Sequence, residues 1–274
     1  MSTVRAALIQ LRTPTDQAAA LAQAEPLVRQ AAADGAQLVV TPEASNILQR
    51  DRAKLFAAVR PLEEDVAVQG LRALARELSI TLLIGSALVK REDGQLANRS
   101  VLVDAEGKIK ATYDKIHMFD VDLPTGERHR ESALYTPGGC AETADTPWGK
   151  IGLTICYDVR FPQLYRALAK AGALIITVPA AFTRPTGEAH WEVLLRARAI
   201  ETGAFILAPA QGGVHEDGRG TWGHSIIVNP WGDVLARAEG DEPCVIAADL
   251  DLEEVGKARA AIPALANDRA FTGP

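Results

Sequence analysis

The chain has 274 residues, 47% of them hydrophobic, which is enough for one large hydrophobic core. Its 29 basic and 35 acidic residues give a net charge of -6, so it lacks the positive charge typical of nucleic-acid-binding proteins. Three widely spaced cysteines argue against a disulfide framework or a cysteine-rich zinc site and fit the reducing cytoplasm. The longest apolar stretch, 173–182, is too short to cross a bilayer. We therefore expect a cytoplasmic protein that binds neither nucleic acid nor membrane.

The first part of the chain alternates between predicted strands and helices. Apolar runs of strand length predict buried strands at residues 4–11, 36–43 and 80–89. Thr15 is the expected N-cap of an alanine-rich helix that ends at Gly35, and a helical region over 52–78 is interrupted by Pro61. This alternation indicates an α/β fold in which helices cover a sheet.

The middle of the chain contains hairpin signals on both sides of a long loop. The AEGK turn predicts an antiparallel hairpin of strands 97–104 and 109–115, and the PWGK turn predicts another hairpin leading into 151–156. Residues 117–139 between them show no periodicity. Loops of that length in a compact domain are usually functional or disordered.

The second half repeats the pattern of the first. Helices are predicted at 161–172 and 188–201, strands at 173–180 and 204–210, and further hairpins up to residue 251. Gly35 and Gly172 each precede a buried strand and are followed seven residues later by Pro42 and Pro179. These segments look like equivalent units of one fold. Without a linker or a break in composition, we expect one domain over 1–274.

Residues of different chemistry follow the predicted strands. Glu43, Lys115, Cys156 and Phe182 stand at the ends of four of them. In open α/β sheets, ligands gather beyond the carboxyl ends of the strands. Each residue alone also has an ordinary explanation: a carboxylate at a helix start, a solvated lysine or an inert buried cysteine. Their common position favours one functional site.

A carboxylate, an ammonium and a thiol suffice for amide hydrolysis. A free thiol has a pKa of about 8.5, so Cys156 needs a base such as Glu43 to remove its proton during attack on a carbonyl. Lys115 can stabilise the resulting oxyanion, and the backbone N–H of Tyr157 is a natural second donor. Arg160 is a candidate to hold a substrate carboxylate.

Three short motifs carry a family resemblance. They are TPEASN around Glu43, YDKIHMFD around Lys115 and LTICYDVRFP around Cys156. In this order and spacing the chain resembles the nitrilase superfamily of carbon–nitrogen hydrolases over about residues 4–249. The resemblance implies an αββα sandwich, a cysteine-dependent hydrolase with a thioester acyl-enzyme, and no cofactor. It also implies association through the helix after Cys156 into a homodimer or larger homo-oligomer.

The resemblance further implies a second glutamate after the lysine loop. In RESALYTPGG, Glu131 stands shortly before a Pro-Gly pair, as expected for a residue that positions Lys115 and the substrate. From the residues alone, Glu131 is equally explained as an exposed loop carboxylate beside Arg128 and Arg130.

Several longer segments resemble one branch of the superfamily. HMFDVDLPTGERHRESALYTPG and AFTRPTGEAHWEVLLRARAIETGAFILAPAQGG resemble the branch that cleaves deaminated glutathione into 2-oxoglutarate and cysteinylglycine. That resemblance implies a substrate pocket lined by Arg160, Phe182 and Thr186. The alternatives are an ω-amidase acting on 2-oxoglutaramate, a carbamoylase or a nitrilase.

No metal or nucleotide site is predicted. No pair of histidines has HxH or HExxH spacing, and QGGVHEDGRG does not match GxGxxG. We therefore assign no metal-binding role to the five histidines, His117, His129, His190, His215 and His224. We expect Glu188 to favour the start of its helix rather than touch the pocket, and a role for His224 at the site stays open.

Overall fold

The computed structural model describes residues 3–124 and 126–273, and two large sheets form its centre. Within these residues the first sheet has the strand order β16-β1-β2-β3-β4-β5. Its strands are β1 Thr3–Gln10, β2 Leu38–Val40, β3 Thr81–Lys90, β4 Leu96–Val103, β5 Ile109–Asp114 and β16 Cys244–Asp251. The strands β1, β2 and β3 run parallel, and the other pairings are antiparallel.

The second large sheet has the order β15-β14-β11-β10-β9-β8. Its strands are β8 Glu142–Thr146, β9 Gly149–Leu153, β10 Ala173–Thr177, β11 Phe205–Ala208, β14 Ile226–Val228 and β15 Val234–Arg237. Here β9, β10 and β11 are parallel. The repeated Gly-strand-Pro segments form β2 and β10, each the middle strand of a parallel triplet. Their predicted equivalence is therefore confirmed.

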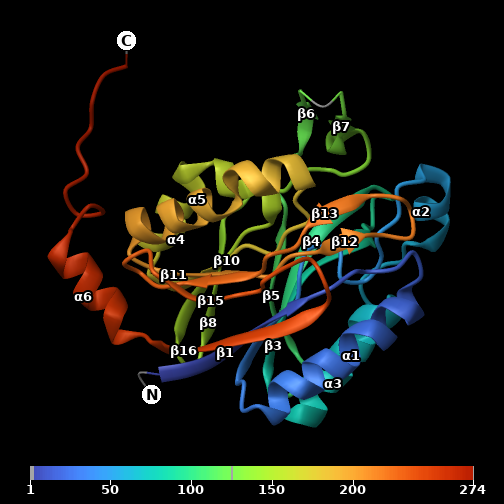
Figure 1. Cartoon of the computed structure of the whole chain (residues 1–274), viewed down its shortest axis with the longest axis horizontal. Helices are drawn as coiled ribbons and strands as arrows, with labels where there is room; N and C mark the ends of the chain where they lie inside the picture. Colours follow the sequence, from blue (N-terminus) through green and yellow to red (C-terminus); the bar gives the residue numbers. More distant parts are fainter. Residues whose placement is uncertain (1–2, 125, 274) are drawn as a thin grey trace.

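Helices cover the outer faces of the two sheets (Figure 1). The covering helices are α1 Gln17–Ala33, α3 Val66–Leu78, α4 Pro162–Lys170 and α5 Arg184–Thr202, whereas α2 Arg52–Ala58 and α6 Glu253–Ala261 lie at the ends of the sandwich. The pair α1 and α3 packs on the first sheet, and α4 and α5 pack on the second. The predicted αββα sandwich is confirmed. No helix in the described part of the chain is long and apolar enough to span a membrane.

Alternation of side chains along the strands explains the layers. On the first sheet, Leu8 and Val40 belong to the buried cluster that also contains residues of the second sheet. Their neighbours Ile9 and Val39 belong to the cluster with Val28 of α1. Successive side chains of a strand point to opposite faces. Because both faces of this sheet are buried, its strands carry continuous apolar runs.

Two predicted helix starts are wrong. The N-cap of α1 is Asp16, whose carboxylate accepts the Ala19 N–H at 2.9 Å, because a carboxylate caps better than a threonine. The helix predicted from 188 begins at Arg184, since Pro185 fits the first turn. Glu188 is therefore beyond the helix start, and it is exposed.

The loop predicted over 117–139 also contains regular structure. It folds into a hairpin of β6 Asp120–Asp122 and β7 Arg128–Arg130, followed by the 3-10 turn Glu131–Ala133. Strands this short carry no apolar alternation, so no pattern in the sequence predicts them. A second small hairpin is formed by β12 Gly212–Val214 and β13 Gly220–Trp222. Both hairpins contribute residues to the same cavity.

Candidate active site

The residues predicted from strand ends come together between the two sheets. Glu43 follows β2 and Lys115 follows β5, both in the first sheet, whereas Cys156 follows β9 in the second. All three are buried and line one cavity. The backbone N–H of Ala181, which follows β10, donates to Glu43 Oε2 at 2.8 Å. This hydrogen bond joins the base to the sheet that carries the thiol.

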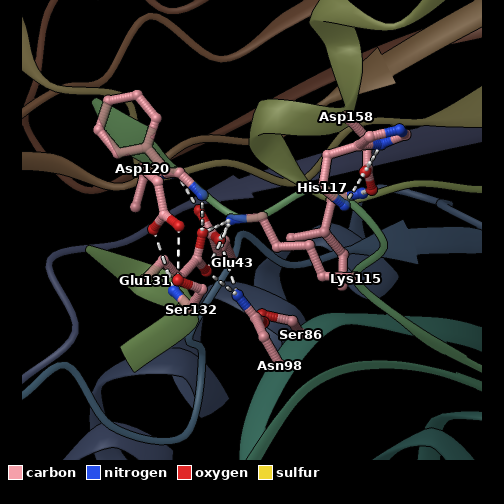
Figure 2. Close-up of polar contacts among 12 residues, drawn as sticks. Glu43, Ser86, Asn98, Lys115, His117, Asp120, Glu131, Ser132 and Asp158 are labelled. Carbon is pink, nitrogen blue, oxygen red and sulfur yellow. Dashed lines mark hydrogen bonds and ion pairs between the residues drawn. The ribbon is translucent and has the colours of Figure 1, made fainter. Parts of the chain in front are cut away.

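Lys115 lies between two carboxylates (Figure 2). Its Nζ is 3.0 Å from Glu43 Oε1 and 2.8 Å from both carboxylate oxygens of Glu131. The lysine side chain is only 2% exposed. Burial works against its charge, but Glu131 and Glu43 outweigh burial and hold the pKa of Lys115 well above its usual value. The lysine is therefore a permanent cation in the site.

Asn98 contacts the same two carboxylates and was not predicted. Its Nδ2 donates to Glu43 Oε1 at 2.9 Å and to Glu131 Oε1 at 3.4 Å (Figure 2). Its carbonyl Oδ1 is buried without a hydrogen bond within the described residues. The alternative amide orientation would turn that oxygen toward two carboxylates, so the orientation is fixed. A buried asparagine inside the apolar strand ANRSVLVD was the signal that could have identified it.

Glu131 is held by the β6–β7 hairpin. The backbone N–H of Phe119 donates to Glu131 Oε2 at 2.7 Å. Asp120 accepts both the N–H of Ser132, at 3.1 Å, and its hydroxyl, at 2.5 Å. These bonds tie the turn that carries Glu131 to the strand that follows Phe119. Glu131 is thus held in place beside Lys115, with which it forms an ion pair, and the alternative of an exposed loop carboxylate is wrong.

Cys156 sits in a left-handed backbone conformation. Strand β9 ends at Leu153, and Cys156 opens the 3-10 helix Cys156–Arg160 with a φ of 51°. Non-glycine residues at positive φ are strained and concentrate at functional sites. Its N–H is bonded to the Pro179 carbonyl at 2.9 Å, whereas the next N–H, that of Tyr157, has no acceptor among the described residues. That free N–H is available to a ligand beside the thiol.

The Cys156 thiol is protonated at rest. Burial and the negative charge of Glu43 raise its pKa well above the usual value, and the opposing effect of Lys115 is smaller. The carboxylate of Glu43 acts on the thiol from within the same cavity. The site thus holds a neutral thiol beside a base rather than a preformed thiolate.

A buried carboxylate supports the turn at Cys156. Asp158 is fully buried and accepts the Ile155 N–H at 2.9 Å and the Tyr113 hydroxyl at 2.6 Å. Its other oxygen accepts the His117 N–H at 3.1 Å and lies 2.7 Å from His117 Nδ1 (Figure 2). Since His117 and Tyr113 flank Lys115, Asp158 connects the lysine strand to the cysteine turn. Asp158 stands in a segment identified from the sequence, but its partners are distant and were not predicted.

The cavity has a volume of about 490 Å³. Phe182 and Thr186 line it together with the residues described above. Arg160 is not among the lining residues; its guanidinium lies over the Phe182 ring at 5.4 Å and 3.3 Å from His190 Nδ1. Neither Glu188 nor His224 lines the cavity, and His224 stacks on Trp222 at 4.2 Å. The structure therefore places two of the three predicted substrate-binding residues at the cavity wall.

Comparison with known proteins identifies the family. The model of the carbon-nitrogen hydrolase family matches residues 5–260. The chain belongs to this family. The hydrolase is 44% identical over 251 residues to deaminated glutathione amidase of Yersinia enterocolitica, covering 90% of this chain and 86% of the relative. It is 36% identical over 269 residues to the human omega-amidase NIT2, covering 98% and 96%.

Solved structures agree with the family assignment. Nit3 of Saccharomyces cerevisiae, a member of branch 10 of the nitrilase superfamily, matches the hydrolase with a TM-score of 0.85 and 32% identity, covering 95% of this chain and 94% of Nit3. The resemblance to the nitrilase superfamily inferred from the three motifs is confirmed.

Proposed function

We propose that the hydrolase cleaves amides through a thioester on Cys156, and that its substrate is deaminated glutathione. The observation that carries the proposal is that Cys156 lines the same cavity as the buried ion pair of Glu43 and Lys115. The high pKa of Cys156 assigns Glu43 the role of general base. The substrate follows from the similarity to deaminated glutathione amidases, the highest of the identities given above.

The first half of the reaction acylates the cysteine. Glu43 takes the thiol proton while sulfur attacks the amide carbonyl carbon. The oxyanion of the tetrahedral intermediate is stabilised by Lys115 and by the free N–H of Tyr157. Glu43 then gives its proton to the departing amine as the carbon–nitrogen bond breaks. This leaves a thioester and a neutral amine.

The second half releases the acid. Glu43 removes a proton from water as the water oxygen attacks the thioester, and the same two donors stabilise the second oxyanion. The thiolate leaves and recovers a proton from Glu43. Glu131 stays bonded to Lys115 throughout and keeps the ammonium in place. Phe182 and Thr186, which line the cavity, are proposed to bind the acyl half, and Arg160 is proposed to position Phe182 through the stacking of its guanidinium on the ring.

The test is turnover by Cys156→Ala, with Cys140→Ala as a matched control because Cys140 is exposed and outside the cavity lining. On deaminated glutathione we expect a loss of more than about 10³-fold for Cys156→Ala and no change for the control. Intact-mass measurement of the wild type should detect the acyl adduct. Wild-type activity in Cys156→Ala would exclude the mechanism.

Products decide the substrate. Deaminated glutathione releases cysteinylglycine, 2-oxoglutaramate releases ammonia, and a carbamoyl substrate also releases carbon dioxide. Fast turnover of 2-oxoglutaramate without turnover of deaminated glutathione would make the protein an ω-amidase instead.

Assembly and location complete the proposal. Leu164 and Leu168 of α4 face the sheet, but Ile200, Trp231 and Ile262 are exposed around one groove and supply apolar surface for a homodimer. Elution of the 29.2 kDa chain as a monomer in size-exclusion chromatography would contradict this. All three cysteines are free, which supports a cytoplasmic location that cell fractionation can test.

A further inference from the structure

Arginine is frequent among the exposed residues that line the cavity, in a chain whose net charge is -6. Five arginines are among the cavity-lining residues: Arg50, Arg128, Arg130, Arg184 and Arg219. Four of them are exposed and the fifth is partly exposed, whereas Glu43, Lys115 and Cys156 are buried. The cavity therefore has a closed end with the reactive groups and a solvent-facing end lined by arginines. The only acidic side chain at that end among the described lining residues is Glu127.

The arginines differ in whether their guanidinium groups already donate hydrogen bonds to a carboxylate. Arg130 donates to both Asp122 oxygens at 2.8 Å, and Arg184 donates to Asp241. The guanidinium of Arg219 makes no hydrogen bond within the described residues. It forms an ion pair with the buried carboxylate of Asp217, whose Oδ2 lies 3.6 Å away and accepts no hydrogen bond within the described residues. The charge of Arg219 is therefore partly balanced, but its N–H donors are free for a ligand. Arg219 is also the least exposed of the five, with 35% of its side chain accessible, so an ion pair there is less screened by solvent.

The backbone at Arg219 is fixed in place. It lies in the turn between β12 and β13, where the His215 N–H donates to the Arg219 carbonyl at 2.8 Å and the Arg219 N–H donates to Asp217 at 2.9 Å. His215 is buried, and its ring nitrogens contact the Thr13 carbonyl at 3.2 Å and the Thr221 hydroxyl at 2.8 Å. The fixed backbone places the guanidinium within reach of a ligand in the cavity, so only the side chain has to be ordered on binding.

The order of product release indicates which half of the substrate lies next to Arg219. The acyl half stays bonded to Cys156 while the amine half leaves first. The amine half must therefore extend toward the solvent-facing end of the cavity. A guanidinium is the side chain best suited to pair with a carboxylate through two parallel hydrogen bonds.

We infer that Arg219 binds a carboxylate carried by the amine half of the substrate, and so selects amides whose leaving group is an anion. This inference rests on the proposed amidase function. Arg50, which has no ion-pair partner among the described residues, adds to the field that attracts the same group.

The experiment compares deaminated glutathione with its analogue in which the terminal carboxylate is a carboxamide. We expect the wild type to prefer the carboxylate by about 10- to 100-fold in kcat/KM, mainly through KM. Arg219→Gln should abolish the preference, and Arg219→Lys should restore part of it. Arg128→Gln is the matched control, because Arg128 also lines the cavity and, within the described part of the chain, also has a carboxylate at ion-pair distance without a hydrogen bond, Asp122 at 3.5 Å, but its side chain is 81% exposed. It should keep the preference.

The outcomes separate the two proposals. Equal turnover of both compounds by the wild type, or a preference that survives in Arg219→Gln, would overturn the assignment of Arg219 and leave the amidase function standing. Turnover of neither compound by the wild type would overturn the proposed substrate, and the assignment of Arg219 with it. A ratio of two substrates on one variant does not change with partial misfolding, so a merely structural role for Arg219 would leave the preference intact.

Discussion

Replacing Lys115 by methionine should separate its role in stability from its role in catalysis. The side chain is 2% exposed and contacts two carboxylates at 2.8–3.0 Å. Lys115→Met would leave Glu43 and Glu131 facing each other without a cation. Removing one partner of a buried ion pair costs about 3–5 kcal/mol. At about 2–4 °C per kcal/mol, the expected fall in Tm is roughly 6–20 °C.

A second substitution tests this reasoning. In Lys115→Met with Glu131→Gln, one of the two uncompensated charges is gone, so we expect most of the lost stability to return. Activity should not return, because the proposed oxyanion donor is still missing. The loss of a single such donor lowers kcat about 10²- to 10³-fold.

The measurements are urea denaturation and initial rates for the wild type, both single variants and the double variant. The key quantity is the coupling between residues 115 and 131 in the free energy of unfolding. Strictly additive effects would refute the uncompensated-charge argument. Recovery of kcat in the double variant would refute the role of Lys115 at the oxyanion.

Further predictions concern the cysteine and its turn. The pKa of Cys156 is raised in the folded state, so the thiol stabilises the fold fully below about pH 8.5, the pKa of a free thiol. This stabilisation is lost as pH rises through the folded-state pKa. Tm should therefore fall more between pH 8 and 10 in the wild type than in Cys156→Ala. Cys156 has a φ of 51°, so Cys156→Gly should be about 1 kcal/mol more stable than Cys156→Ala in urea denaturation, and the reverse order would contradict backbone strain. Asp158→Asn weakens the support from Ile155 and Tyr113, and we expect kcat to fall about 10²-fold at nearly constant KM; an unchanged kcat would show that the turn holds without the carboxylate.

The sequence predicted the parts of the site that depend on short local patterns. Glu43, Lys115 and Cys156 each follow a strand in a recognisable motif, and the apolar runs of those strands predicted the layers. Glu131 required the family resemblance, because its loop has no periodicity. Asn98 and the partners of Asp158 were missed for a different reason. Their roles depend on which strands become neighbours. The contacts of an isolated polar residue with distant parts of the chain cannot be predicted from its local sequence.

The position of the base and the nucleophile on different sheets has a consequence for folding. Glu43 belongs to the first sheet, and its contact with Ala181 spans 138 residues of sequence. Contacts this distant form late, after local hairpins and helices have been made. During refolding, circular dichroism should therefore recover before turnover does. The recovery of turnover therefore reports the final step of folding, in which one sheet of the sandwich packs on the other.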